Sequence, residues 1–258
     1  MTGSVFSALS IAGSDPSGGA GIQVDLKTFA RTGVWGMAVI TALTAQNVSR
    51  VSGSWPVDPG IVREQIETLL EEMTPQAIKT GMLANREIIR VVALMLPEKV
   101  PLVIDPVMVS TSGYRLLDES AIEMLCSELI PHAALVTPNI PEAMILSGCT
   151  EIADEEQMAD AGYRILDMGA KQVVVKGGHG TGADASDILV TKQGVTRFSS
   201  SRILYEVHGS GCSYSAAITG WLARGYTVHK SCECAKELVN QGIQNAIAGR
   251  SGRRMINP

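Results

Sequence analysis

The chain has 258 residues, of which 45% are hydrophobic, and a net charge of −5 at neutral pH. This length is enough to bury a sizeable core, and it fits one domain spanning residues 1–258. The negative charge argues against a general affinity for nucleic acid or for an anionic membrane. Because no stretch approaches the roughly 18 apolar residues of a membrane span and residues 1–11 lack a signal-peptide pattern, we expect a cytoplasmic protein.

Glycine and cysteine usage narrows the class further. There are 26 glycines, whereas aromatic residues make up only 4% of the chain, a balance typical of tight strand-to-helix turns. The five cysteines are odd in number and irregular in spacing, so they predict free thiols. Cys232 and Cys234 lie in a helical pattern, where neighbouring side chains diverge, and no second pair follows to complete a metal site.

Short apolar runs alternate with longer amphipathic segments. The runs predict buried strands at residues 6–11, 77–78, 102–104, 135–136 and 173–175. Apolar residues at three- and four-residue steps predict helices at 61–73, 86–96, 121–129 and 155–168. Right-handed crossovers put the carboxyl ends of these strands on one edge of a parallel sheet, where ligands usually bind.

Two further segments depart from this alternation. Residues 36–54 are strand-like, and residues 187–198 predict a hairpin around Lys192-Gln193-Gly194. Residues 212–224 and 228–247 predict two successive helices that close the far side of the sheet. The tail, residues 249–258, is basic and polar, and we expect it to be frayed.

The most informative motif is His208-Gly209-Ser210-Gly211-Cys212, between a strand-like stretch and a helix. The two glycines let the backbone turn its N–H groups toward one point, and the helix adds its positive dipole end. This arrangement favours a bound phosphate and a lowered thiol pKa at Cys212, which predicts a nucleophile or base. A glycine-rich turn with a small cysteine packed behind it explains the same residues when they are considered alone.

A second glycine-rich loop, Ala12 to Gly21, follows the first predicted strand. It contains neither G-K-[ST] nor G-x-G-x-x-G, so it supports neither a P-loop nor a dinucleotide-binding fingerprint. Its glycines let the backbone fold over a small planar ligand, with Asp15 or Asp25 accepting hydrogen bonds. An ordinary turn or cap is the alternative interpretation of Asp15.

Polar residues also follow three later strands. Asp105 precedes a proline at one strand end, where it could be a metal-side carboxylate. Asn139 and Glu142, three apart at a helix start, could share one hydrated Mg²⁺, but a capping box explains them equally well. Lys176 could meet phosphate oxygens, and the glycines after it, including Gly178, would admit a nucleotide.

These motifs lie at strand ends that should share one edge of one sheet. Glycine loops, a lysine, carboxylates suited to Mg²⁺ and an activated group in an anion hole are the components of phosphoryl transfer. Any one of them alone would usually be a turn or a cap. Together they predict a kinase without a Walker motif.

In chain order these motifs resemble the hydroxymethylpyrimidine/phosphomethylpyrimidine kinases of thiamine biosynthesis, a branch of the ribokinase superfamily that overlaps with bacterial pyridoxal kinases. The shared stretches are A-G-S-D-P-S-G-G-A-G-I-Q-V-D-L-K-T-F (12–29), T-A-Q-N (44–47), K-T-G-M-L (79–83), D-P-V-M-V (105–109), T-P-N-I-P-E (137–142), V-K-G-G-H (175–179) and G-S-G-C (209–212). The resemblance implies an α/β fold, a ribokinase-like three-layer α/β/α sandwich with a mostly parallel central sheet.

The resemblance also implies an activity. This is the phosphorylation, dependent on ATP and Mg²⁺, of 4-amino-5-hydroxymethyl-2-methylpyrimidine and then of its monophosphate. Pyridoxal kinase is the alternative, because a pyridine ring with a 5-hydroxymethyl group fits the same pocket. A non-catalytic ligand sensor is less favoured, since the predicted catalytic, metal and phosphate-binding residues are all present. We expect a homo-oligomer, and a dimer in particular.

For the substrate, the resemblance assigns the ring to Gln46. Its amide carbonyl can accept from the ring's amino group while its NH₂ donates to a ring nitrogen. The residues implied to line the same pocket are Gly19, Ala20, Asp25, Met82 and Val107.

For the phosphoryl donor, the resemblance places ATP over Asn139, Lys176 and Gly178, with Mg²⁺ near Asp105 and Glu142. The backbone N–H groups of Gly209, Ser210 and Gly211 would receive the charge on the transferred phosphoryl group. Cys212 would face the substrate hydroxymethyl group or its phosphate, as a base or an acceptor-positioning group, without a covalent intermediate.

The chain departs from the family pattern at several sites. Ser210 and Ser213-Tyr214 are mild changes from the usual Thr and Thr-Leu or Thr-Phe, and Val207 replaces a more usual threonine. Residues 110–114, S-T-S-G-Y, lack the lysine often found there, and the tail after Gly249 lacks the usual G-H-G ending.

Overall fold

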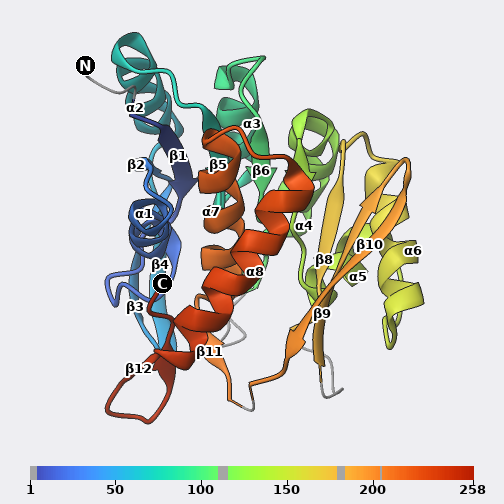
Figure 1. Ribbon diagram of the computed structural model, residues 1–258. Coiled ribbons are helices and arrows are strands. Elements are labelled where there is room, and N and C mark those ends of the chain that lie inside the picture. The colour runs from blue at the N-terminus through green and yellow to red at the C-terminus, as the bar shows by residue number, and fades with distance from the viewer. Residues whose placement is uncertain (1–4, 110–115, 179–183, 204) are drawn as a thin grey trace.

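A computed structural model of the chain describes residues 5–109, 116–178, 184–203 and 205–258 (Figure 1). Its centre is an eight-stranded sheet in the order β10-β9-β8-β7-β6-β5-β1-β2, parallel from β2 to β8, with β9 and β10 antiparallel. The strands are β1 (Ser7–Ala12), β2 (Trp35–Ile40), β5 (Ala77–Thr80), β6 (Leu102–Ile104), β7 (Leu135–Val136), β8 (Val173–Lys176), β9 (Asp184–Thr191) and β10 (Gly194–Ser201).

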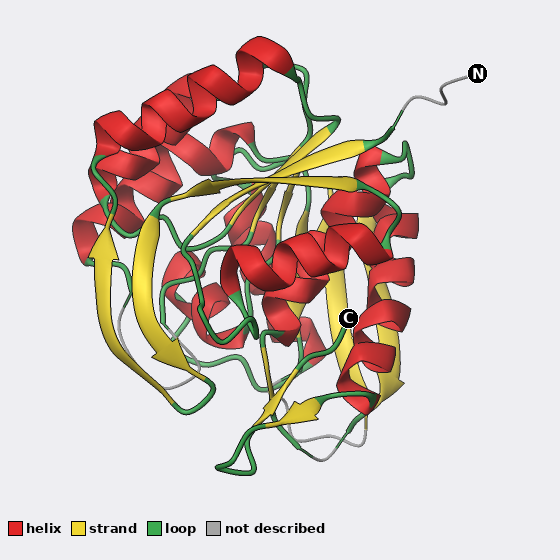
Figure 2. Ribbon diagram, turned by 90° about the vertical axis from the view of Figure 1, so that its left-hand side faces the viewer, coloured by secondary structure: helices red, strands yellow, loops and turns green. Residues whose placement is uncertain are grey.

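Helices cover both faces of this sheet (Figures 1 and 2). One face carries α1 (Gly21–Arg31), α7 (Ser210–Ala223) and α8 (Val228–Gln244). The other carries α2 (Pro59–Glu72), α3 (Arg86–Met95), α4 (Glu119–Met124), α5 (Ile140–Ser147) and α6 (Glu155–Leu166). A π-helical turn, Leu125–Leu129, and a 3₁₀ turn, Ile130–His132, extend α4. The predicted three-layer α/β/α sandwich is therefore confirmed.

The central strands are continuous apolar runs because both of their faces are buried. In β6, Leu102 and Ile104 belong to the core under α2 to α6, whereas Val103 belongs to the core under α7 and α8. Successive residues of a strand point to opposite faces, so a strand between two helical layers has no polar face.

A separate hairpin stands beside the sheet. It consists of β3 (Ala42–Asn47) and β4 (Arg50–Pro56), which pair antiparallel with a bulge between Ala45 and Gln46. Figure 2 shows the two strands extending away from the main sheet. The strand-like prediction for residues 36–54 is confirmed, as is the hairpin of β9 and β10, in which Thr191 pairs with Gly194.

The C-terminal tail is ordered, and our expectation that it frays is wrong. Three short strands, β11 (Val207–His208), β12 (Ile247–Ala248) and β13 (Arg254–Met255), form a small sheet in which β13 lies parallel to β11. Ile256 is only 3% exposed and packs into the core under α8. The tail thus supports the strand that leads into the predicted phosphate cradle.

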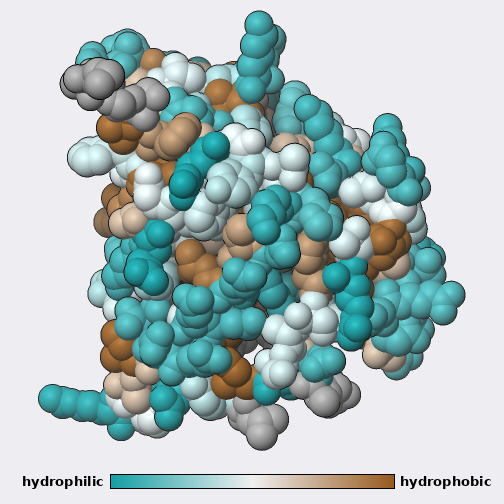
Figure 3. Space-filling view, viewed as in Figure 1, coloured by the Kyte–Doolittle hydropathy of each residue, from teal (hydrophilic) through white to brown (hydrophobic). Residues whose placement is uncertain are grey.

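The state of the cysteines and the polarity of the surface agree with what the composition predicts. All five cysteines are free thiols, and Cys232 and Cys234 lie in α8 as predicted. On the face seen in Figure 3, hydrophobic residues are scattered among hydrophilic ones. Among the described residues, no helix has both the length and the apolar character needed to cross a membrane.

Candidate active site

The carboxyl ends of five neighbouring strands meet at one edge of the sheet. Backbone hydrogen bonds continue the ladder beyond the ends of β6 and β7. Asp105 N–H donates to the carbonyl of Thr80 at 2.9 Å, and Lys176 N–H donates to that of Pro138 at 2.8 Å. A cavity of about 810 Å³ lies at this edge. The predicted convergence of the motifs is therefore present in the structure.

Most of the predicted site residues line this cavity. They are Ala20, Gln46, Met82, Asp105, Val107, Asn139, Glu142, Lys176, Gly178, Gly209, Ser210, Gly211 and Cys212. Gly19 and Asp25 are not among the lining residues: Gly19 packs against His208 and Met255, and Asp25 is fully buried. His179 and the departure at residues 110–114 lie outside the described residues.

The cradle at the start of α7 is built on glycine. Gly209 precedes the helix with φ +84°, and a Cβ there would collide with the carbonyl oxygen of Gly19. A glycine is needed for both reasons, and the contact joins the two glycine-rich loops. Within the described part of the chain, no side chain caps the first N–H groups of α7, so they remain available to an anion.

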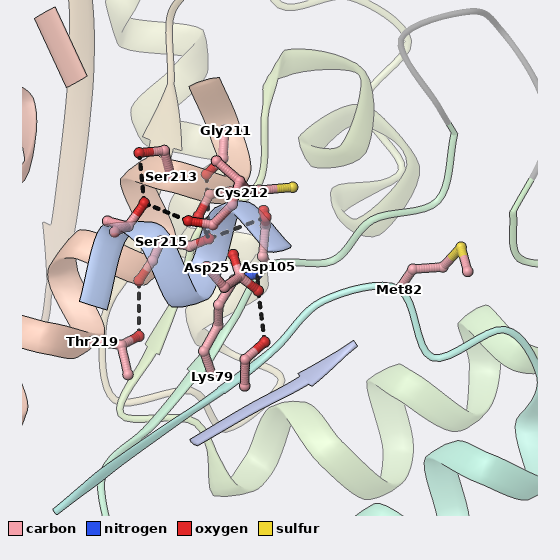
Figure 4. Close-up of polar contacts among 12 residues, drawn as sticks. Asp25, Lys79, Met82, Asp105, Gly211, Cys212, Ser213, Ser215 and Thr219 are labelled. Carbon is pink, nitrogen blue, oxygen red and sulfur yellow. Dashed lines mark hydrogen bonds and ion pairs between the residues drawn. The ribbon is translucent and has the colours of Figure 1, made fainter. Parts of the chain in front are cut away.

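Cys212, in the first turn of α7, does not have the lowered thiol pKa that we expected. Burial raises its pKa to about 12, and the carboxylates of Asp105 and Asp25 add to the rise. The Lys79 ammonium and the Gly21 N–H oppose it but do not prevail. Figure 4 shows Cys212 beside Asp25 and Asp105, with its sulfur turned away from Ser213 and Ser215. The thiol is therefore neutral at physiological pH.

A buried ion pair lies behind Cys212. Lys79 Nζ is 2.8 Å from Asp25 Oδ2, and both side chains are 0% exposed. The hydroxyl of Ser10 donates to the same carboxylate oxygen at 2.6 Å. Burial alone would lower the pKa of Lys79, but Asp25, Cys212 and Asp105 together raise it. Lys79 is therefore a fixed positive charge beneath the cradle, and we call Lys79 and Asp25 the sealed pair.

A second ion pair faces the cavity. Lys176 Nζ is 2.8 Å from Asp105 Oδ1, and the two side chains are 11% and 2% exposed. The Ser215 hydroxyl donates to Asp105 Oδ2 at 3.1 Å. Burial would raise the pKa of Asp105, but Lys176 and Lys79 outweigh it and lower that pKa. We call Lys176 and Asp105 the open pair.

The open pair adjoins both the cradle and α5. A Cβ built on Gly211 would lie 3.2 Å from Lys176 Nζ, so this ammonium lies next to the cradle. On the α5 side, Asn139 Oδ1 accepts from Glu142 N–H and Glu142 Oε2 accepts from Asn139 N–H, both at 2.9 Å. The capping-box alternative is therefore confirmed, and Glu142 still lines the cavity.

The carboxylates of this edge fit a magnesium ion that arrives with a nucleotide. Among the described residues, no three His, Cys, Asp or Glu side chains form a metal-binding group. Mg²⁺ commonly takes only one or two carboxylates, together with waters and substrate phosphates. Asp105 and Glu142 supply that donor set. Burial raises the pKa of Glu142 to about 7, with Lys176 opposing and Asp105 reinforcing the shift.

A polar cluster at the hairpin side of the cavity joins three distant segments. His208 Nε2 lies 3.0 Å from Asp15 Oδ2 and 3.2 Å from the side-chain amide of Gln46. Asp15 Oδ1 accepts from both the N–H and the hydroxyl of Ser17, at 2.9 and 2.7 Å. The turn interpretation of Asp15 is thus correct, and the same residue also contacts the site.

Sequence reasoning assigned no function to Lys236, which lines the cavity, or to Lys79, which lies at the edge of the cavity with a side chain that is 0% exposed. One feature of the sequence could have pointed to Lys79: it is a charged residue directly after the predicted apolar strand 77–78. Lys236, on α8, is 2.7 Å from Asp187, whose other oxygen accepts the Gly177 N–H at 3.0 Å. This contact holds the glycine turn after Lys176, and the amphipathic pattern of α8 did not indicate it.

The fold and the site together define a ribokinase-like kinase: a mostly parallel sheet with a glycine cradle, a lysine and two carboxylates at one edge. Residues 15–257 match the phosphomethylpyrimidine kinase family, and the chain belongs to this family. The family, the fold and the class of enzyme expected from the sequence are confirmed.

Three similar proteins illustrate the relationship. A hydroxymethylpyrimidine/phosphomethylpyrimidine kinase of Staphylococcus aureus is 40% identical over 97% of this chain and 92% of its own length. A thiamine biosynthesis bifunctional protein of Geobacter sulfurreducens is 43% identical over 97% of this chain, which spans 52% of that longer protein. The structure of an ADP complex of Bacillus subtilis pyridoxal kinase is 35% identical, with a TM-score of 0.90 over 98% of this chain and 97% of that one.

Proposed function

We propose that the protein transfers the γ-phosphoryl group of ATP to the hydroxymethyl group of 4-amino-5-hydroxymethyl-2-methylpyrimidine, and then phosphorylates the monophosphate. The observation that carries this proposal is that one cavity holds Gln46 at one side, the Lys176 ammonium at the other and the uncapped N–H groups of α7 between them. An acceptor ring and a donor phosphate can therefore meet at the cradle. The name of the S. aureus relative supports the same substrate class.

The nucleotide side of the site consists of Asn139, Lys176 and Gly178. The Lys176 ammonium, held by Asp105, supplies a fixed charge for the phosphates, and a Cβ on Gly178 would meet no atom of the described residues within 4 Å. Mg²⁺ bound by Asp105 and Glu142 would neutralise charge on the donor phosphates. The likeness to a kinase solved with ADP supports the use of a nucleotide as phosphoryl donor.

At the transfer step, the γ-phosphorus forms a bond to the acceptor oxygen as its bond to the β–γ bridging oxygen breaks. ADP leaves, and the proton of the acceptor hydroxyl passes to an oxygen of the transferred phosphoryl group. The N–H groups of Gly209, Ser210 and Gly211 stabilise the charge on the transferred group. Phosphoryl transfer passes through a loose transition state, so positioning and charge stabilisation do most of the catalysis. A neutral Cys212 thiol fits this chemistry as a hydrogen-bond donor that positions the acceptor, and its raised pKa argues against a thiolate base.

A second candidate activity is the phosphorylation of pyridoxal. It is favoured by the likeness to the B. subtilis pyridoxal kinase. We further propose that the chain acts as one domain, in the cytoplasm and as a homodimer.

The test is an assay of purified protein with ATP, Mg²⁺ and the pyrimidine alcohol, in which monophosphate and diphosphate products are separated. Pyridoxal is assayed in parallel at matched concentrations. We expect both pyrimidine phosphates to form and kcat/KM to be higher for the pyrimidine. A higher kcat/KM for pyridoxal would favour the second activity, and no phosphorylation of either ring would refute both.

A further inference from the structure

The cluster of Asp15, His208 and Gln46 lines the cavity but has no part in the transfer step described above. Its members come from the loop after β1, from β11 and from β3, so the fold brings them together across as many as 193 residues of sequence. Asp15 and His208 are buried, and Gln46 is partly exposed. The position of the hydrogen atoms in this cluster decides what Gln46 offers to a ligand.

The proton on His208 can be located from its partners. A carboxylate can only accept hydrogen bonds, and Asp15 Oδ2 lies 3.0 Å from His208 Nε2. Burial would raise the pKa of Asp15, but the contacts with His208 and Ser17 outweigh it and lower that pKa, so Asp15 is ionised. Nε2 must then carry a hydrogen. This holds whether the imidazole is neutral or charged.

Two neighbours then determine the orientation of the Gln46 amide. One end of the amide lies 3.2 Å from His208 Nε2, whose single hydrogen already donates to Asp15. An NH₂ group at that end would face this N–H, whereas an amide oxygen can share its hydrogen with Asp15 in a three-centre bond. The other end lies 3.5 Å from Thr44 Oγ1. Thr44 already donates its hydroxyl hydrogen to the Ser14 carbonyl at 2.7 Å, so it can only accept from Gln46. A hydrogen-bond donor, the NH₂ group, is needed at that end.

In the structure Gln46 Nε2 faces His208 and Gln46 Oε1 faces Thr44. Both neighbours require the reverse orientation, in which the amide is turned by 180°. The oxygen toward His208 keeps one lone pair, and the nitrogen toward Thr44 keeps one N–H. Gln46 therefore offers the cavity one acceptor and one donor in a fixed order. A ring that carries an amino group next to a ring nitrogen pairs with that order in a single register.

We propose that Asp15 and His208 are positioning residues that set this donor–acceptor order of Gln46, and thereby the specificity of the site for an aminopyrimidine edge. This inference rests on the proposed function for its substrate. Its hydrogen-bond geometry stands independently of the activity.

The first test is ¹⁵N NMR of the intact protein labelled with ¹⁵N-histidine. The chain has four histidines, so four sets of ring-nitrogen signals need assignment. A His208→Gln variant identifies the His208 signals by their loss. We expect Nε2 of His208 to show the shift of a protonated ring nitrogen. A bare Nε2 would overturn the proposal, whatever the protein phosphorylates.

The second test is Asp15→Asn, which lets the residue donate to His208 and so favours the opposite tautomer. We expect the KM for the pyrimidine alcohol to rise about tenfold or more, with kcat and the KM for ATP changed less than about twofold. In a Gln46→Ala background the same substitution should have little further effect, because Asp15 acts through Gln46. Equal effects in both backgrounds would overturn the proposal.

Ser17→Ala is the matched control, since it removes a hydrogen bond from the same carboxylate and leaves the His208 contact. We expect it to keep the KM of the wild-type protein. A KM as high as that of Asp15→Asn would show that the loop, and not His208, sets the affinity, and would refute the proposal. Unfolding midpoints and ADP affinity establish that each variant is folded. If the wild-type protein phosphorylated neither ring, the proposed function would be refuted. The NMR experiment would still test the hydrogen-bond geometry of His208.

Discussion

The two Lys–Asp pairs of the site have the same N–O distance, 2.8 Å, and different surroundings. The sealed pair, Lys79 and Asp25, is 0% exposed on both sides, whereas Lys176 of the open pair is 11% exposed and faces the cavity. Ions that are both sealed from water interact only with each other and with fixed charges and dipoles. An ion at a cavity wall can change partners. The same chemical pair is therefore sealed inside the fold in one place and, in the other, lies where the proposed mechanism needs a charge for the phosphates.

The sealed pair should be the more costly one to break. Lys79→Met leaves Asp25 buried without its counter-ion, and we expect a loss of about 3–5 kcal/mol in the free energy of unfolding. Urea denaturation measures this loss. The double variant Lys79→Met/Asp25→Asn removes both charges while the introduced amide keeps an acceptor for the Ser10 hydroxyl, so it should recover most of the stability. A single-variant loss below about 1 kcal/mol would mean that Asp25 simply takes up a proton.

The open pair should affect catalysis more than stability. Lys176→Met removes the charge next to the cradle, and we expect kcat to fall by about 10²–10³-fold, as for other preorganised electrostatic groups. The free energy of unfolding should change by only about 1 kcal/mol, because Asp105 keeps the Ser215 hydroxyl and the nearby positive charge of Lys79.

Lys176→Arg is the matched control, since it keeps the charge and should retain part of the rate. If Lys176→Met destabilised the protein as much as Lys79→Met and left kcat intact, the contrast between the two pairs would be wrong. Steady-state kinetics and urea denaturation on the same preparations give both answers.

The open pair could be anticipated from the sequence, and the sealed pair could not. Asp105 and Lys176 each follow an apolar run, and the ends of parallel strands converge, so local pattern and sheet topology suffice to place them together. Asp25 lies in a helix, 54 residues before Lys79, and no local pattern links the two. The amphipathic pattern of α1 does not indicate that Asp25, one of its charged residues, is buried.

The errors of prediction have the same origin. The expected low pKa of Cys212 was based on its position at a helix N-terminus. Burial and the carboxylates of Asp25 and Asp105, which come from distant segments, raise that pKa instead. In the tail, Met255 and Ile256 are held against Gly19 and Gly242, and glycines carry no apolar side chain that would indicate a partner. Both outcomes depend on tertiary contacts that the local pattern does not encode.

Cys212 is close enough to both pairs for the charges of Lys79, Asp25 and Asp105 to act on its thiol pKa. Its neutral thiol can donate a hydrogen bond, so Cys212→Ser should keep kcat within about tenfold, whereas Cys212→Ala should lower it by about 10–100-fold. Because burial raises the thiol pKa to about 12, kcat should show no thiol titration near neutral pH. Steady-state kinetics across that range measure both effects. Rapid alkylation of Cys212 at neutral pH would instead indicate a thiolate and restore the base mechanism.

The smallest expected effect comes from Glu142, the third ionisable group beside the open pair. Its pKa is about 7 in the folded protein and 4.5 in the reference state, so between those values the folded chain binds more protons than the unfolded chain. The contribution of Glu142 to the free energy of unfolding is therefore fully present below the unfolded-state pKa of 4.5, and it is lost as the pH rises through the folded-state pKa of about 7. We expect the free energy of unfolding to fall by about 1 kcal/mol between about pH 6 and about pH 8.

Glu142→Gln isolates this contribution, because glutamine keeps an acceptor for the Asn139 N–H and cannot ionise. The difference in unfolding free energy between the two proteins should therefore change with pH, while the remaining groups cancel. The charges that act on Glu142 belong to the open pair, so Lys79→Met/Asp25→Asn should leave this pH-dependent difference in place. A difference that does not vary with pH would show that Glu142 is ionised throughout, and that the open pair already offsets the effect of its burial.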